Sequence, residues 1–442
     1  MASLLLRAGR IIDPAADRDE AGDLRIDDGR IVAVGPADAS CGAPGRAADR
    51  TLDCTGLLVV PGLIDLHVHL REPPVPGAQA ADLAETIASG AAAAVAGGFT
   101  TICAMPNTQP PIDGPEAVAR YIARGREAAL ARVLPVGCLT RGRAGREPAD
   151  LAAMRGAGAA MFSDDGADVA DPKVFEAALA LAARVGAPVS CHCEDAALAA
   201  GGVMNDSPMA TALGLPGIPA EAEEAAVERA CAAAARTRCR VHIAHVSTAG
   251  AVDIIRRAKA RGAPVTAEVT PHHLALTDEA LRRRDAVFKV NPPLRSGHDI
   301  DALLAAVRDG TIDCLATDHA PHAAAAKARP LAEAPSGMIG LESALGVWAR
   351  VLVNRAGLGW PALVRMLTAS PARVLGIEAG TLAAGAVADV TVIDPRAAWT
   401  IDPAAFASRA RNCPFAGWEV RGKVVLTIVG GKVVYQAPGT QG

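Results

Sequence analysis

Short apolar runs alternate with longer alanine-rich stretches through the middle of the chain. The apolar runs have the length of strands, and glycine or proline marks most junctions, as at Gly186 and Pro188. This alternation predicts parallel strands joined by helices, because a parallel pair needs a long crossover connection. We place eight strands near residues 62–69, 98–105, 132–139, 158–163, 188–193, 240–246, 264–270 and 312–318. Helical stretches between them include 172–185, 219–236 and 248–261.

The two ends of the chain follow a different pattern. Both contain short runs rich in β-branched residues, separated by turn signals such as Gly430-Gly431, which predict antiparallel strands. The predicted fold class is therefore α/β, a (β/α)8 barrel of the TIM type with a small β-sandwich domain formed from both termini. The expected division is 1–55 and 376–442 for the sandwich and 56–375 for the barrel. A doubly wound sheet is the alternative for the middle of the chain.

Composition narrows the class of protein. The chain has 442 residues, of which 51% are hydrophobic and 21% charged, so it can bury a large core. A net charge of -4 and an aromatic content of 3% argue against nucleic acid as a partner. The ten cysteines form no CxxC pair, which excludes a zinc ribbon. With no signal peptide and no long apolar run, we expect a cytoplasmic protein that does not enter a membrane.

Histidine or aspartate follows five of the predicted strands, and functional side chains of such barrels project from these strand ends. His67 and His69 are two residues apart and face the same side of their strand, so both can hold one ion. His242 and His245 are three apart, so at most one faces inwards, and we interpret His242 as a core residue. The other candidates at strand ends are Asp164, Asp165, His192, Asp318, His319 and His322.

These residue types point to metal-dependent chemistry. Imidazole and carboxylate ligands together suit zinc, with manganese or cobalt as possible substitutes. Two histidines, a bridging aspartate, two further histidines and one more aspartate would hold two ions. The sequence has no G-x-S-x-G nucleophile elbow, and neither a P-loop nor a dinucleotide-binding glycine pattern follows a predicted strand. A serine hydrolase or a nucleotide-binding protein is therefore disfavoured.

Several motifs carry a resemblance to a known family. The segment PGLIDLHVHLREP resembles the opening of the amidohydrolase superfamily. The motifs that follow, in order, are GGFTTICAMPNTQPPID, MFSDDG, CHCED, HIAHVST, VNPPLR, TDHAPH, GMIGLE and RNCPFAGWEVRGKV. Together they resemble type I dihydroorotases, over nearly the whole chain. The resemblance implies reversible cyclisation of N-carbamoyl-L-aspartate to L-dihydroorotate, the third step of de novo pyrimidine synthesis.

The resemblance also implies a role for individual residues. The first zinc ion would be held by His67, His69 and Asp318, and the second by His192 and His245, with Asp165 bridging the two. Asp318 would also be the catalytic base. The substrate carboxylate would be bound by Arg71, Asn107 and His322. The ring side would meet Asn291 and the backbone of Ser336 and Gly337.

The end of the fourth predicted strand separates related subfamilies. Hydantoinases, allantoinases and type II dihydroorotases bridge their metals with a carboxylated lysine, but here the nearest lysine is Lys173, well into the next helix. Two departures from the type I pattern stand out. The loop at 74–85 is longer than in most relatives, and Ser336 occupies a position where many relatives have phenylalanine.

Other functions and partners remain open at this point. The chain could be another cyclic amidase of the dihydropyrimidinase or allantoinase type. It could also be a non-catalytic, dihydroorotase-like subunit of aspartate transcarbamoylase, although such subunits lose ligands and this chain keeps all six. We expect a homo-oligomer, and the resemblance allows assembly with aspartate transcarbamoylase.

Overall fold

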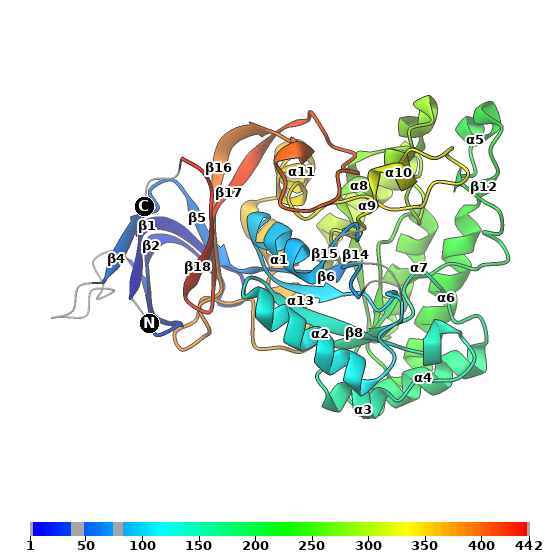
Figure 1. The fold of residues 1–442 in the computed structure, drawn as a ribbon, viewed down its shortest axis with the longest axis horizontal. Coiled ribbons are helices and arrows are strands. Elements are labelled where there is room, and N and C mark those ends of the chain that lie inside the picture. Colours follow the sequence, from blue (N-terminus) through cyan, green and yellow to red (C-terminus); the bar gives the residue numbers. More distant parts are fainter. Residues whose placement is uncertain (1–2, 37–47, 74–82, 440–442) are drawn as a thin grey trace.

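The computed structural model describes residues 3–36, 48–73 and 83–439, which form a barrel and a separate β-sheet beside it (Figure 1). Both described ends of the chain lie on the side of the terminal sheet, away from the barrel. The predicted fold class is confirmed: a (β/α)8 barrel accompanies a β domain built from both ends of the chain.

Eight parallel strands form the barrel, in the order β15-β14-β13-β10-β9-β8-β7-β6. Their bounds are Leu63–Val68 (β6), Phe99–Ala104 (β7), Arg132–Cys138 (β8), Met161–Ser163 (β9), Val189–Cys191 (β10), Val241–Ile243 (β13), Val265–Val269 (β14) and Cys314–Leu315 (β15). An isolated parallel bridge pairs Val68 with His319, and the His69 amide donates to the His319 carbonyl at 2.8 Å. These contacts bring the first strand beside the segment after the last one and nearly close the barrel.

The helices cover the barrel through apolar faces. In α4 (Pro172–Arg184) the buried residues are Phe175, Ala178, Leu179 and Ala182, the spacing of one helix face. Asp171 caps this helix by accepting from the Lys173 amide. The other helices are Ile87–Ala96 (α1), Pro115–Ala128 (α2), Leu151–Gly156 (α3), Pro208–Leu213 (α5), Ala220–Thr237 (α6), Ala249–Ala260 (α7), Pro271–Ala275 (α8), Gly297–Asp309 (α9), Ala324–Lys327 (α10), Ala344–Trp348 (α11), Trp360–Leu367 (α12) and Ala369–Leu375 (α13).

The terminal strands form one continuous sheet in the order β18-β17-β16-β5-β1-β2-β3, with β4 paired to β1. Their bounds are Leu4–Asp13 (β1), Arg18–Asp27 (β2), Arg30–Gly35 (β3), Arg50–Asp53 (β4), Leu58–Pro61 (β5), Val390–Thr400 (β16), Glu419–Val429 (β17) and Lys432–Gln436 (β18). β5 pairs with both β1 and β16 and so joins the two ends of the chain. The predicted hairpin at Gly430-Gly431 connects β17 to β18.

Two smaller features complete the fold. A two-stranded sheet, Met204–Asn205 (β11) with Gly217–Ile218 (β12), lies between β10 and α6 and was not predicted. The cysteines that the structure describes are all buried free thiols. Among the described residues, no helix combines the length and hydrophobicity needed to cross a membrane.

Candidate metal and substrate site

The carboxyl ends of the barrel strands surround a cavity of about 290 Å³. All but one of the residues to which the resemblance assigns a role line it. They are His69, Arg71, Asn107, Asp165, His192, His245, Asn291, Asp318, His322, Ser336 and Gly337. The remaining one, His67, is 1% exposed and is a member of two groups of ligand-type side chains that include cavity residues. The topology therefore collects these residues from eight separate segments of the chain into one place.

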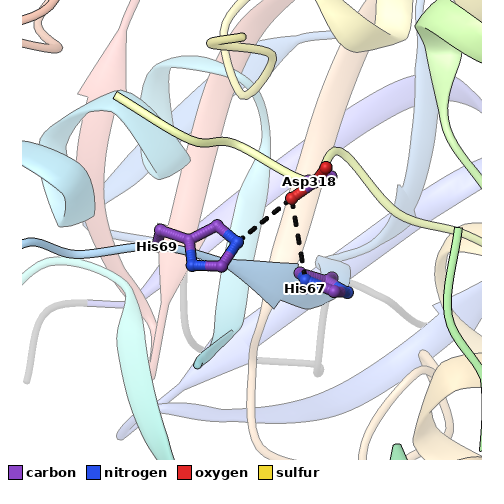
Figure 2. A group of neighbouring side chains, drawn as sticks. All are labelled: His67, His69 and Asp318. Atoms are coloured by element: carbon purple, nitrogen blue, oxygen red, sulfur yellow. Dashed lines mark hydrogen bonds and ion pairs between the residues drawn. The ribbon is translucent and has the colours of Figure 1, made fainter. Parts of the chain in front are cut away.

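The first group consists of His67, His69 and Asp318 (Figure 2). His67 lies in β6 and His69 follows it, so both side chains reach the same region, whereas Asp318 follows β15. Asp318 Oδ1 lies 3.1 Å from His69 Nε2 and 3.6 Å from His67 Nε2. The backbone of Asp318 has φ 47°, a left-handed conformation that costs free energy in a non-glycine residue. Such strain at a polar strand end is typical of functional sites.

The second group consists of His67, Asp165 and His245, and Asp165 follows β9. His192 follows β10 and His245 follows β13, and His192 Nδ1 lies 2.9 Å from His245 Nε2. Both nitrogens are 3.9 Å from Asp165 Oδ1. The same oxygen is 3.2 Å from His67 Nε2, while Asp165 Oδ2 is 3.6 Å from His69 Nε2. Asp165 thus lies between the two histidine pairs, as a bridging ligand would.

Burial and neighbouring charges have opposite effects on the pKa values of His67 and Asp165. Burial lowers the pKa of His67, but Asp165, Glu268 and Asp318 together raise it well above its usual value. Burial raises the pKa of Asp165, yet His67, His245 and His69 outweigh it and hold that pKa well below its usual range. The carboxylates are therefore ionised, and they create a potential that attracts a cation.

The donor set fits a metal ion. His67 Nδ1 lies 3.0 Å from Glu268 Oε1 and can donate to it, while Nε2 faces the oxygens of Asp165 and Asp318, where a bound cation would take the place of the second ring proton. Among the described residues, His67 Nε2 finds no hydrogen-bond partner of good geometry. The His192 and His245 nitrogens that approach each other are likewise both able to offer lone pairs. Without a cation one of these two rings donates to the other, and a divalent cation bound by both nitrogens would take the place of that proton.

Glu268 is the residue that the sequence analysis missed. It lies in β14 with 0% exposure, and its two oxygens are 3.0 Å from His67 Nδ1 and 3.0 Å from His242 Nε2. His242 also contacts Thr266 Oγ1 at 2.8 Å, so the predicted core histidine is hydrogen-bonded on both ring nitrogens. A lone acidic residue inside the apolar run of β14 was the available signal, because a buried charge needs partners.

The proposed substrate side of the cavity is lined by the charged side chain of Arg71 and by neutral polar side chains. Arg71 donates from Nε to the Pro321 carbonyl at 3.1 Å, and its guanidinium lines the cavity. Asn107 contacts His69 Nδ1 through Oδ1 at 2.9 Å and donates to Asp165 Oδ2 at 3.0 Å. It therefore orients two of the predicted ligands as well as lining the cavity. Asn291 Oδ1 is buried and has no hydrogen-bond partner in the described part of the chain.

The loop around Ser336 lines the same cavity as Arg71. His322 Nε2 donates to the Ser336 carbonyl at 2.7 Å, because a carbonyl oxygen can only accept. Burial and the nearby Arg71 charge lower the pKa of His322 to about 3, so this ring is neutral at pH 7. Gly337 has φ +139°, and a Cβ there would lie 2.7 Å from His322 Nε2. Only glycine fits this close approach without displacing the histidine.

Two neighbours of the predicted ligands point elsewhere. Asp164 accepts from the Leu139 and Thr140 amides at 2.9 and 3.0 Å, away from the histidines. His319 contacts Glu85 Oε2 at 3.3 Å and so faces away from the cavity, as strand alternation predicts for the residue after Asp318. The lengthened loop predicted at 74–85 falls largely on 74–82, which lie outside the described residues.

Comparison with known proteins agrees with this geometry. Residues 58–434 match the amidohydrolase family, which is more than half of the chain. The chain belongs to the amidohydrolase family. A dihydroorotase of Pelotomaculum thermopropionicum is 49% identical over 434 residues, covering 98% of both chains. A dihydroorotase of Geobacter metallireducens is 44% identical over 434 residues, covering 98% of this chain and all (100%) of the relative.

Solved structures of this amidohydrolase fold extend the comparison. The L-hydantoinase (dihydropyrimidinase) from Arthrobacter aurescens superimposes with a TM-score of 0.85 at 27% identity, covering 99% of this chain and 96% of the other. The dihydropyrimidinase from Brevibacillus agri has a TM-score of 0.84 at 24% identity, covering 98% and 95%, which is evidence of fold alone. Sequence identity therefore groups the chain with dihydroorotases, while the overall fold is shared with other cyclic amidases.

Proposed function

We propose that this amidohydrolase is a zinc-dependent dihydroorotase, which interconverts N-carbamoyl-L-aspartate and L-dihydroorotate. The observation that carries the proposal is a single cavity in which carboxylates and imidazoles suited to two ions lie beside Arg71 and Asn107. The relatives named dihydroorotase support the same choice, at 44% identity or more across nearly the whole chain.

The proposed zinc ligands divide into two sets around one bridging carboxylate. The first ion would be held by His67, His69 and Asp318, the second would be held by His192 and His245, and Asp165 would be available to both. A divalent ion bound there supplies Lewis acidity, which polarises the amide carbonyl and makes water a nucleophile at neutral pH. The bridge needs no modified lysine, since Asp165 stands at the end of β9 and Lys173 lies in α4.

Substrate orientation falls to residues on the other side of the cavity. Arg71 offers the planar fork of donors that suits a carboxylate, and the second Nδ2 hydrogen of Asn107 adds a neutral donor. His322 completes this side as a neutral ring. Asn291 and the backbone at Ser336 and Gly337 contact the ring amide, and the unpartnered Oδ1 of Asn291 supports this role. Together these contacts present the scissile amide to the ligand cluster.

Asp318 moves the proton. Burial raises its pKa, but His69 and His67 hold the pKa well below its usual value, so the carboxylate is ionised and able to accept. In ring opening, Asp318 takes a proton from the attacking water and delivers it to the ring nitrogen as the C–N bond breaks. The single product, N-carbamoyl-L-aspartate, carries a new carboxylate and a carbamoyl NH2 group, and the second proton of the water is released as the carboxyl group ionises. In the biosynthetic direction the same groups act in reverse, and water leaves.

Assays on three substrates, with metal analysis of the same sample, test the proposal. We expect turnover of dihydroorotate, little or none of hydantoin and allantoin, and up to two zinc ions per chain. Faster turnover of hydantoin would favour the dihydropyrimidinase alternative, whose fold the chain shares. A fully metallated but inactive sample would instead favour a non-catalytic subunit of aspartate transcarbamoylase.

Assembly is a separate part of the proposal. We propose a homo-oligomer that is also able to bind aspartate transcarbamoylase, with no nucleic-acid partner and a cytoplasmic location. Light scattering of the purified chain, alone and mixed with aspartate transcarbamoylase, measures both associations directly. A monomer at micromolar concentration would contradict the first, and an unchanged mass on mixing would contradict the second.

A further inference from the structure

The segment between β16 and β17 reaches from the terminal sheet to the substrate cavity. It contains the motif RNCPFAGW, to which the proposed function assigns no role. Asn412 in this motif is 6% exposed and therefore buried. Its side chain contacts the barrel loops that carry His322 and Gly337.

The amide of Asn412 joins two loops through their backbones. Its Nδ2 donates to the Ala320 carbonyl at 3.1 Å and to the Gly337 carbonyl at 3.1 Å. Its Oδ1 accepts from the His322 amide at 3.2 Å. The backbone carbonyl of Asn412 also accepts from the Ile339 amide at 3.1 Å. The side chain thus uses both its donors and its acceptor to join the loop of Ala320 and His322 to the loop of Gly337.

The two joined loops are those that shape the substrate side. His322 Nε2 meets the Ser336 carbonyl at 2.7 Å, and the Ala320 amide donates to the Met338 carbonyl at 2.7 Å. The Gly337 carbonyl accepts from Lys327 Nζ at 2.9 Å as well as from Asn412. A small shift of either loop would therefore change the position of His322 relative to Arg71.

Other hydrogen bonds, which do not involve Asn412, hold the rest of this segment against the barrel. Glu342 accepts from the Ala407 and Ser408 amides at 2.8 and 3.1 Å. Glu85 accepts from the Ser408 hydroxyl and from the Arg409 amide. Because these anchors remain when the Asn412 side chain is removed, its loss should loosen the cavity loops without releasing the segment.

We infer that Asn412 is a positioning residue for substrate binding: it holds His322 and Gly337 in place from outside the barrel. This inference rests on the proposed dihydroorotase function. We expect the effect in substrate affinity, because the described side-chain hydrogen bonds of Asn412 go to backbone groups of the cavity loops. None of these bonds reaches a proposed metal ligand.

Steady-state kinetics of Asn412→Ala and Asn412→Asp test the inference. Both variants lose the two donors, and aspartate also sets a charge against two carbonyl oxygens while keeping the acceptor for His322. We expect KM for dihydroorotate to rise about tenfold, the effect of roughly one lost hydrogen bond, with kcat and zinc content changing little. The near-isosteric Asp variant should not rescue KM, and it carries the test if the alanine variant folds poorly.

The matched control is Asp13→Ala. Asp13 is 1% exposed and accepts from Thr381 Oγ1 at 2.8 Å and the Leu382 amide at 2.7 Å, within the terminal domain. Its loss should lower Tm and leave KM unchanged. If the Asn412 variants behave in the same way, with a lower Tm and a normal KM, the positioning role is overturned. An inactive, fully metallated wild-type enzyme would overturn the proposed function itself, and the inference with it.

Discussion

Two histidines at the proposed zinc site have their orientation set by neutral or acidic partners. His69 is oriented by Asn107, and His67 by Glu268, each through Nδ1, so that both Nε2 atoms face the carboxylates. The His67–Glu268 contact is the more deeply buried of the two, with both side chains at most 1% exposed. Burial raises the pKa of Glu268, but hydrogen bonds from His242 and His67 lower it to about 2. Glu268 is therefore a permanent acceptor at neutral pH.

Glu268→Gln should weaken zinc binding by about 10–100-fold, because one end of the amide would present a donor to a histidine that already donates. The barrel should stay folded. Competition with a chromophoric chelator measures the affinity, and circular dichroism measures Tm. Asp389→Asn is the control, since Asp389, which precedes β16, pairs with Arg132 at the start of β8 and none of its described contacts is with a proposed ligand. Equal zinc affinity in Glu268→Gln and wild type would show that Glu268 does not orient His67.

Asp318→Asn should keep the fold and at least one zinc ion, because the amide oxygen can still coordinate. It should lose a factor of about 10²–10⁴ in turnover, since an amide cannot accept the proton from water. Asp318→Ala should lose both zinc and turnover. Zinc content, Tm and kcat measured on the same samples separate these effects. Near-normal turnover of the Asn variant would exclude Asp318 as the proton carrier.

At the scale of elements, local pattern predicted the barrel well. All eight predicted strands exist, and the helices expected at 172–185 and 219–236 appear as α4 and α6, within two residues of the predicted ends. Hydrophobic periodicity is a local property, which is why it could be read from the chain. The first terminal segment reaches further than residue 55, because β5 pairs with β1 and β16. We therefore propose that the terminal domain includes residues up to Pro61.

The loop at Gly337 offers a prediction at this scale. Gly337→Ala should lower kcat/KM for dihydroorotate by roughly tenfold or more, since the added methyl group meets His322 and the backbone conformation costs about 1–3 kcal/mol. Zinc content should be unchanged. Gly357→Ala is the matched control, because Gly357 has φ +71° and no atom within 4 Å of its Cβ position among those that the structure describes. It should lose stability alone, and a similar kinetic loss in both variants would contradict a specific role for Gly337.

At the scale of the whole molecule, the apolar core of the protein is built without the side chains of the proposed metal centre. The large apolar cluster includes Phe99, Phe162 and Trp348 of the barrel and extends to Val420 and Val424 of β17. The terminal sheet has an apolar cluster of its own, which includes Leu24 and Ile428. Folding should therefore not depend on zinc, although zinc should stabilise the folded state.

Removal of zinc should abolish turnover and lower Tm while leaving the secondary structure intact. At a free zinc concentration 1,000 times Kd, binding stabilises the folded state by about 4 kcal/mol. Far-ultraviolet circular dichroism with and without chelator measures Tm and secondary structure, and the dihydroorotate assay measures turnover. Zinc should restore Tm and activity, whereas magnesium, which prefers an all-oxygen shell, should not. An unfolded apoprotein, or a Tm that chelation leaves unchanged, would contradict this account.

The sequence by itself determined the order of strands and helices and the residue types that end each strand. These depend on periodicity and spacing over a few positions, and they placed histidine or aspartate at the ends of five strands. The resemblance to type I dihydroorotases then singled out His67, His69, Asp165, His192, His245 and Asp318 as the proposed ligands. Only the tertiary structure decided which atoms of these side chains face each other and what holds them. His67 and Glu268 are 201 positions apart, and His322 and Asn412 are 90 apart. A hydrogen bond is directional and short, so such partners become visible only once barrel closure brings distant segments within about 3 Å.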